Sequence, residues 1–312
     1  MLHQPFGVGT EQPRLVSTLL GHAHVDMALL CLASLLDLSA EPLRLRVHDD
    51  GTLTATDLER LAEGLRDPAF VPRREADERL ADVLATRQAT SQFRDCNPLA
   101  LKVLDVPLLA GDGELAYCDS DVLFLRPFSR LFDLPKGAGA LFMRDPQNAY
   151  SVRSWHLLAE PRLRLAAHVN TGIIAFRTRW FDLDLVEWFL TRPEYHFAPV
   201  WVEQTCWALL AQPAGCRLLD PAAVGIPVPG RELPAGQVAL HFVGPVRSLL
   251  PAYAGRAAER SRLSVAPDQR DAVVVRSSGA RRLTAGALAA TELRRRLGRL
   301  GPLGRLAGRR GR

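Results

Sequence analysis

The sequence predicts an α/β protein with a mostly parallel, mixed sheet that is flanked by helices. Apolar stretches of strand length alternate along the chain with stretches of helical length, which is the pattern of β-α-β units. Acidic residues follow several of the expected strands, at the edge where such a sheet collects its ligands. With 312 residues, 47% of them hydrophobic, the chain is long enough for a substantial core.

The chain opens with one β-α-β unit. Residues 15–21 (LVSTLLG) form a short apolar run that predicts a strand. Residues 25–38 (VDMALLCLASLLDL) are apolar on nearly every side, which is typical of a helix buried against a sheet. Residues 42–51 (PLRLRVHDDG) alternate apolar and basic residues before a turn and predict the second strand.

The same alternation continues along the chain. Residues 75–90 predict a helix because Leu80, Val83 and Leu84 share one face. Residues 115–127 predict a strand, although two aspartates interrupt it. The other expected helices cover 98–110, 183–192 and 202–212, and the other expected strands cover 139–145, 170–176 and 238–244.

Composition excludes several classes of protein. The net charge is +5 and the pI is about 9.2, but most of the basic excess follows residue 255, and we expect no nucleic-acid partner. Nearly all cations are arginines, with Lys102 and Lys136 the only lysines, which together with the abundant alanine and leucine indicates a GC-rich, bacterial genome. The five cysteines are scattered and odd in number, so neither a disulfide framework nor a zinc site is predicted.

The predicted organisation is one domain over residues 1–255 and a basic tail over residues 256–312 that is flexible or weakly helical. The N-terminus lacks the pattern of a signal peptide, and no apolar run approaches the roughly 18 to 20 residues that cross a bilayer. A cytoplasmic location is therefore expected.

The tail also suggests peripheral contact with the inner face of the plasma membrane, because leucines recur among its arginines. Glycine and proline interrupt any helix there, which favours a disordered tail instead. The leucines in question are Leu297, Leu300, Leu303 and Leu306.

The segment YCDSDVLF carries the strongest chemical signal. Asp119 and Asp121 are embedded in an apolar run, where uncompensated carboxylates cost free energy and repel one another. An ordinary turn is the alternative, but no glycine, proline or asparagine follows, and the apolar run continues. The pair therefore predicts hard oxygen ligands for Mg²⁺ or Mn²⁺, a cation supplied from outside the chain.

A second signal is HFVGPVR, residues 241–247. His241 can complete the coordination of a metal, Gly244 lets backbone N–H groups approach a phosphate, and Arg247 can hold phosphate oxygens in a fork. A core histidine followed by a Gly-Pro turn is the alternative. The presence of the aspartate pair favours a common diphosphate site.

These segments carry a family resemblance. YCDSDVLF, VNTGIIAF, VEQTCWALL and HFVGPVR, in this order over residues 15–250, resemble GT-A type nucleotide-sugar glycosyltransferases. The similarity is greatest to the retaining, family 8-like group that contains glycogenin and lipopolysaccharide galactosyltransferases. The chain departs from that pattern with Arg247 in place of a lysine and Glu203 in place of an aspartate.

The resemblance implies that Asp119, Asp121 and His241 bind the metal. It implies that the diphosphate contacts Gly244 and Arg247, the latter with a changed geometry.

The resemblance also implies donor-sugar contacts. Asn170 and Gly172, in the NTG turn, would face the donor sugar; Asn170 can equally cap that turn. Gln204 would lie under the anomeric carbon with Glu203 touching sugar hydroxyls, although acids are favoured in any first helical turn. Lys102 would lie near the donor phosphates, unless it is a surface lysine with a buried stem.

The segment HDDGTLT imitates the first motif of haloacid-dehalogenase phosphatases, but His48 occupies the position of the nucleophilic aspartate. That interpretation therefore fails. The segment also looks like the second-strand motif of many GT-A enzymes, which assigns Asp50, and after it Asp49, to the nucleoside. Asp145, in FMRDPQNAY, is expected to meet the donor or acceptor sugar.

The predicted function is that of a metal-dependent hexosyltransferase using Mn²⁺ or Mg²⁺. The donor is a nucleoside diphosphate sugar, with UDP-hexose expected, and the acceptor is a glycan or a lipid-linked glycan. Retention follows from the resemblance; an inverting enzyme would need a base such as Glu203 or Asp145. The alternatives are a sugar-phosphate nucleotidyltransferase, whose glycine-rich loop is missing after the first strand, and a catalytically silent binding domain.

Overall fold

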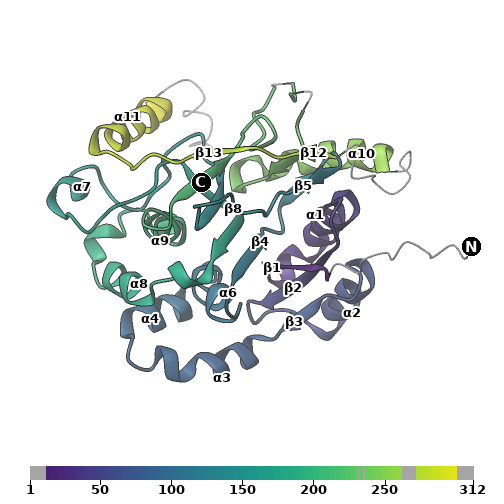
Figure 1. Ribbon diagram of the computed structural model, residues 1–312, viewed down its shortest axis with the longest axis horizontal. Helices are drawn as coiled ribbons and strands as arrows, with labels where there is room; N and C mark the ends of the chain where they lie inside the picture. Colours follow the sequence, from purple (N-terminus) through teal and green to yellow (C-terminus); the bar gives the residue numbers. More distant parts are fainter. Residues whose placement is uncertain (1–11, 231, 235, 262–271, 301–312) are drawn as a thin grey trace, which may run out of the picture.

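The computed structural model describes residues 12–230, 232–234, 236–261 and 272–300 (Figure 1). Its centre is an eight-stranded sheet in the order β13-β9-β7-β8-β4-β1-β2-β3. Neighbours are parallel from β4 to β3 and between β7 and β9, and β8 is antiparallel to both of its neighbours. The predicted α/β fold with a mostly parallel mixed sheet is thus confirmed. The strands are β1 Arg14–Leu20, β2 Leu43–Asp49, β3 Ala69–Val71, β4 Glu114–Cys118, β7 Ala140–Arg144, β8 Val169–Arg177, β9 Cys216–Leu219 and β13 Ser277–Gly279.

Helices cover both faces of the sheet, and alternate strand residues enter two separate cores. In β8, Ile174 and Phe176 pack on one face with helices α8 and α9, while Ile173 and Ala175 pack on the other face with α1. This two-sided burial explains why β8 reads as a continuous apolar run. The helices longer than one turn are α1 Val25–Leu38, α2 Ala55–Gly64, α3 Arg73–Leu84, α4 Gln88–Cys96, α8 Leu183–Leu190, α9 Val202–Ala211, α10 Leu250–Ser261 and α11 Ala285–Leu300.

Several predicted elements are divided in the structure. The helix expected over 75–90 is two helices, α3 and α4, because Arg87 leaves the helical conformation and its side chain donates to the carbonyl of Val83. The helix expected over 98–110 is two single turns, α5 Ala100–Val103 and α6 Asp105–Leu108. Pro107 has no N–H to donate to the carbonyl four residues earlier, so one continuous helix cannot form.

A small sheet packs beside the large one and positions the candidate site. It has the order β10-β11-β5, with β5 Val122–Phe124, β10 Val224–Gly225 and β11 Ala239–His241. The predicted strand over 115–127 is therefore two strands in two sheets, β4 and β5, which are separated by the aspartates.

Residues 272–300, which belong to the segment predicted as a tail, pair with strands of the body and pack against it. Residues 277–279 form β13 at the edge of the large sheet, where they pair with β9, and residues 273–274 form β12, which pairs with β6 (Phe128–Ser129). Leu288 of α11 is buried in the core that α8 and α9 form with the large sheet, which fixes this helix to the body. Residues 272–300 are thus part of the folded domain. Of the four leucines proposed for membrane contact, Leu297 is exposed, and Leu303 and Leu306 lie outside the described residues.

No helix in the described ranges combines the length and the apolar character of a bilayer-spanning segment. The remaining short helices are α7 His156–Ala159 and the 3₁₀ turns η1 His22–His24, η2 Thr178–Trp180, η3 Pro193–Tyr195, η4 Pro199–Trp201 and η5 Gly244–Leu249.

The stability of this fold is expected to depend on pH through His48 on β2. Its ring is buried, and neither ring nitrogen has a hydrogen-bond partner among the described residues. Burial, assisted by the charge of Arg46, lowers the pKa of His48 from 6.5 to about 3. Between these two pH values His48 binds a proton in the unfolded chain but not in the folded chain. The stability of the fold therefore falls as the pH drops below 6.5. Near pH 5 the loss is about 2 kcal/mol.

Urea unfolding of wild type and His48→Leu at pH 5 and pH 7 measures this effect. The variant should show a smaller pH dependence than wild type, and His24→Leu, which changes an exposed histidine, should not. Equal pH dependence in wild type and His48→Leu would contradict the expected role of His48.

Candidate metal centre

The segment Asp119-Ser120-Asp121 lies where the chain passes from the large sheet to the small one. β11 runs antiparallel to β5 with His241 opposite Val122, the residue directly after the segment. The backbone N–H of Phe242 donates to the carbonyl of Asp121 at 2.8 Å. This register brings His241 beside the aspartates, although the two segments are far apart in the sequence.

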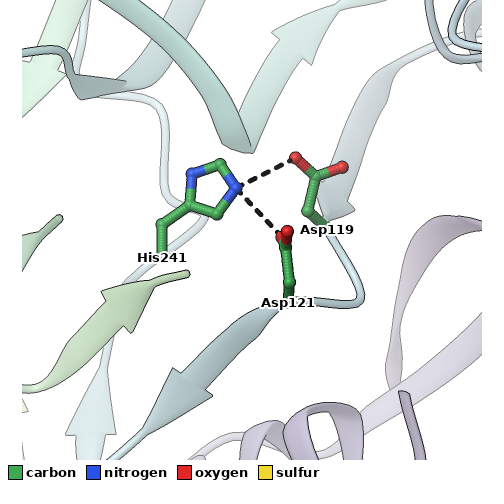
Figure 2. A group of neighbouring side chains, drawn as sticks. All are labelled: Asp119, Asp121 and His241. Atoms are coloured by element: carbon green, nitrogen blue, oxygen red, sulfur yellow. Dashed lines mark ion pairs between the residues drawn. The ribbon is translucent and has the colours of Figure 1, made fainter. Parts of the chain in front are cut away.

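One imidazole and two carboxylates face one another at this point (Figure 2). Nε2 of His241 lies 3.0 Å from Oδ1 of Asp121 and 3.5 Å from Oδ2 of Asp119. One ligand atom from each residue lies within 4.8 Å of the others. His241 and Asp121 are 5% and 7% exposed, whereas the Asp119 side chain is 22% exposed. The group is therefore enclosed by protein but accessible from the side of Asp119.

Asn170 sets the orientation of the imidazole. The backbone N–H of Gly172 donates to Oδ1 of Asn170 at 3.0 Å, which identifies this atom as the amide oxygen. The same oxygen lies 3.0 Å from Nδ1 of His241, so Nδ1 carries the proton of this hydrogen bond. Nε2 is then the nitrogen that faces the carboxylates, and its lone pair can bind a metal when the ring is neutral.

Two cations of the chain pair with the aspartates. Nζ of Lys102 donates to both carboxylate oxygens of Asp119 at 2.8 Å, and the hydroxyl of Tyr117 donates to Oδ1 at 2.7 Å. Arg247 donates to Oδ2 of Asp121 at 2.8 Å. Lys102 and Arg247 thus supply part of the positive charge that the aspartate pair needs, beside the cation predicted from outside the chain.

The charges at the site shift the protonation of its members. Burial raises the pKa of Asp121, but His241 and Arg247 outweigh this and lower it overall, so the carboxylate is ionised. Burial lowers the pKa of His241, and the charges of Asp121 and Asp119 outweigh this and raise it. A proton on Nε2 competes with a metal ion for the same atom, so rising pH favours metal binding.

The donor set fits a divalent cation such as Mn²⁺ or Mg²⁺. It offers two carboxylate oxygens and one imidazole nitrogen, with no thiolate. Within the described ranges, this is the one group of three or more His, Cys, Asp or Glu side chains with such a spacing.

Glu203, at the start of α9, extends the polar network from Lys102. Nζ of Lys102 donates to Oγ1 of Thr171 at 3.1 Å, and that hydroxyl donates to Oε2 of Glu203 at 3.2 Å. Burial raises the pKa of Glu203 to about 7 despite the nearby charge of Lys102. Oε1 of Glu203 lies 3.9 Å from Nζ and has no hydrogen-bond partner in the described part of the chain.

Asp145 and Gln204 lie next to each other. Nε2 of Gln204 lies 3.4 Å from Oδ2 of Asp145 and donates to the carbonyl of Ala149 at 2.8 Å. The side chain of Asn170 also hydrogen-bonds Asp145. Burial raises the pKa of Asp145 despite these hydrogen bonds. A continuous polar chain therefore runs from His241 through Asn170 to Asp145 and Gln204.

A cavity of about 160 Å³ begins at the aspartates and reaches the carboxyl end of β2. Asp119, Asp121 and Arg247 line it at one end, and His24 and Asp50 also line it. Asp50 packs against the backbone of Gly21, where an added Cβ would lie 2.1 Å from Oδ2 of Asp50. Only glycine permits this approach.

Two residues predicted to bind the donor, Asp49 and Gly244, do not line this cavity. Oδ1 of Asp49 accepts hydrogen bonds from the backbone N–H groups of Gly51 and Leu53 at 2.8 and 3.1 Å, so this carboxylate closes the turn after β2 and does not line the cavity. Gly244 begins η5, and an added Cβ there would meet no atom within 4 Å. Nothing in the structure requires glycine at that position.

The imidazole of His241 needs a residue without a Cβ at position 172. Gly172→Ala is therefore expected to weaken metal binding about 10- to 100-fold. An added Cβ would lie 2.4 Å from Nδ1 of His241, so the ring must move away from its hydrogen bond with Asn170. Calorimetric titration with MnCl₂ measures the loss, with Gly286→Ala as a control because its Cβ meets no atom within 4 Å. Equal Mn²⁺ affinity of wild type and Gly172→Ala would show that the ring position does not matter.

Three residues near the site were not predicted from the sequence. Tyr117 precedes Asp119 by two positions, the strand spacing that places both side chains on one side, and this was the available signal. Thr171 lies between Asn170 and Gly172 and bridges Lys102 and Glu203, which no sequence pattern indicates. His24 reaches the cavity only because η1 turns the chain after β1.

Comparisons with solved structures identify the fold. The galactosyltransferase LgtC in complex with donor and acceptor sugar analogues matches with a TM-score of 0.53 at 15% identity, over 82% of this chain and 98% of LgtC. The glycosyltransferase GlyE of Streptococcus pneumoniae matches with a TM-score of 0.51 at 12% identity, over 80% of this chain and 63% of GlyE. The chain has the GT-A fold. The bifunctional glycosyltransferase WbbM also matches, with a TM-score of 0.50 at 12% identity over 78% of this chain and 47% of WbbM.

No protein-family model and no curated protein sequence matches the chain. The low identities to the solved structures mean that the comparison supports the GT-A fold alone. In this GT-A fold the candidate metal ligands Asp119, Asp121 and His241 lie at the carboxyl end of β4, next to β1 in the sheet.

Proposed function

We propose that this protein is a metal-dependent glycosyltransferase that transfers a hexose from a nucleoside diphosphate sugar to an acceptor hydroxyl. The observation that carries the proposal is the group Asp119, Asp121 and His241 at one end of an open cavity in a chain with the GT-A fold. The structure of LgtC contains donor and acceptor sugar analogues, which makes the same class of ligand the first choice for this chain.

The metal end of the site is suited to a departing diphosphate. Asp119, Asp121 and His241 would hold Mn²⁺ or Mg²⁺, which when bound stabilises the negative charge that develops on the leaving group. The Arg247 side chain is 42% exposed at the cavity, so its guanidinium can exchange Asp121 for phosphate oxygens. We infer that Gly244, at the start of the same turn, lets the backbone approach the diphosphate.

Lys102 has a different task in this proposal. It is 2% exposed, and its ammonium group is held by Asp119 and Thr171. It therefore positions Asp119 and keeps a positive charge beneath the donor phosphates, and it does not reach into the open cavity.

The other end of the polar network is suited to the donor sugar. The unpartnered Oε1 of Glu203 would accept a sugar hydroxyl, and Asn170 and Asp145 would contact others. Gln204 would lie under the anomeric carbon, with its amide held by Ala149. Gly172 would serve the donor site through His241, because the missing Cβ leaves room for the imidazole.

We propose retention at the anomeric carbon. Glu203 and Asp145, the carboxylates considered as a base for inversion, are both buried and engaged in hydrogen bonds, which favours roles in holding the donor. NMR of the product tests the stereochemistry, because inversion would require one of these carboxylates to act as a base.

The nucleoside would occupy the cavity between the metal group and β2, where Asp50 can accept hydrogen bonds from the ribose or the base. We propose UDP-hexose as the donor and a glycan or lipid-linked glycan as the acceptor. A cytoplasmic enzyme with peripheral membrane contact near the exposed Leu297 would suit a lipid-linked acceptor.

Release of nucleoside diphosphate from a panel of nucleotide-sugars, with Mn²⁺ and with EDTA, tests the proposal. We expect hydrolysis of one donor, dependent on Mn²⁺. Mn²⁺-dependent nucleotide binding without turnover of any donor would instead indicate a silent binding domain. Pyrophosphate release from a nucleoside triphosphate and a sugar 1-phosphate would indicate a nucleotidyltransferase.

A further inference from the structure

A hollow of about 330 Å³, larger than the cavity at the metal group, lies at the other end of the sheet. It is lined by residues at the amino ends of β7 and β9, which run parallel, and by the segment after β13. Asp145 follows the carboxyl end of β7, at the opposite end of the strand, and no residue lines both this hollow and the cavity at Asp119. The hollow is therefore separate from the proposed transferase site.

The walls of this hollow carry positive charge from three separate segments. Lys136 precedes β7, Arg217 lies on β9, and Arg281 and Arg282 follow β13. No aspartate or glutamate lines the hollow, and much of its remaining surface is glycine and alanine. Small residues leave the space between the cations open.

The cations of the hollow have no acidic partner in the part of the chain that the structure describes. Within the described residues, no carboxylate lies within 4.0 Å of the side-chain nitrogens of Lys136, Arg217, Arg281 or Arg282. Arg217 is held instead by Ser277, whose carbonyl accepts from the guanidinium at 2.8 Å. Like charges gathered around one space repel one another, and an anion in that space would remove the repulsion.

We propose that this hollow binds the phosphate group of a phosphorylated ligand. Guanidinium groups match the geometry of phosphate oxygens as forks, and the lysine ammonium adds a compact charge. The volume lies in the range of small-ligand sites, and Lys136, Arg281 and Arg282 are exposed to solvent at its walls. A soluble phosphate compound and a phospholipid headgroup share this chemistry.

Calorimetric titration of the full chain with inorganic phosphate, in EDTA to remove any metal-bound phosphate, tests the site. We expect one-to-one binding that becomes at least about tenfold weaker in Arg281→Gln/Arg282→Gln, because each lost charge-assisted hydrogen bond is worth that much. The control Arg60→Gln/Arg74→Gln removes the same charge from α2 and α3, where both arginines pair with acids. It should bind phosphate like wild type.

Vesicle co-sedimentation distinguishes the two sources. Binding to phosphatidic acid vesicles but not to phosphatidylcholine vesicles, lost in Arg281→Gln/Arg282→Gln and kept in the control, assigns a lipid headgroup; phosphate binding without vesicle binding assigns a soluble ligand. If neither phosphate nor vesicles bind, or if both double variants lose binding equally, the proposal is overturned. Donor hydrolysis should be unchanged in both double variants, so this test is independent of the transferase proposal.

Discussion

Asp121→Asn is expected to reduce Mn²⁺-dependent donor hydrolysis and transfer about 100- to 1,000-fold. The substitution removes one of the three candidate metal ligands and also the counter-charge of both His241 and Arg247. Asparagine keeps the shape of the side chain, so the backbone contact with Phe242 should persist. Steady-state rates measured over a range of Mn²⁺ concentrations give both the residual rate and the change in metal requirement.

The matched control is Asp112→Asn, which changes an exposed aspartate in the turn before β4. It should retain the wild-type rate. His241→Ala should resemble Asp121→Asn, because the imidazole belongs to the same group. Wild-type activity and Mn²⁺ dependence in both site variants would contradict the metal assignment.

Lys102→Met is expected to lower the free energy of unfolding by about 3–5 kcal/mol and to abolish transfer. The ammonium group is buried and donates to both carboxylate oxygens of Asp119 at 2.8 Å, so its loss leaves this carboxylate without its closest cation. Urea unfolding at neutral pH measures the effect. The control is Lys136→Met, which changes the only other lysine of the chain. Lys136 is exposed, so this variant should have a stability close to that of wild type.

A double variant separates charge from packing. Lys102→Met/Asp119→Asn should be less destabilised than Lys102→Met, because the acid that lost its cation has become neutral. If Lys102→Met unfolds at the wild-type urea concentration, the ammonium group does not stabilise the site as its contacts suggest.

The sequence predicted those parts of the fold that have long, regular patterns. The helix over 25–38 has the predicted bounds because it is apolar all round and packs against the sheet. The predicted strand over 170–176 lies within β8, whose two faces are both buried. Helix α2 and strand β3 were missed, although the Thr54–Asp57 capping box at the start of α2 was a readable signal.

The shortest elements could not be predicted. Strands of two or three residues, such as β10, β12 and β13, carry no period, and their pairing depends on residues distant in the sequence. For the same reason residues 256–312 were predicted to be a tail, although β9 provides a partner strand for β13.

At the site, the chemical types of the residues could be predicted from the sequence better than their contacts could. Asp119, Asp121 and His241 were predicted from their ligand types, and the structure brings them together. The sequence did not reveal that Lys102 and Arg247 pair with the aspartates, because an ion pair between distant segments depends on strand register. It also did not reveal that Asp49 closes a turn while its neighbour Asp50 lines the cavity.

The position of a bound manganese ion tests the proposed metal centre most directly. Crystals of the full chain grown with MnCl₂ and a nucleoside diphosphate would give an anomalous difference map at the manganese absorption edge. The expected result is one peak about 2.0–2.6 Å from carboxylate oxygens of Asp119 and Asp121 and from Nε2 of His241. A peak elsewhere, or none at saturating manganese, would contradict the assignment of these residues as metal ligands.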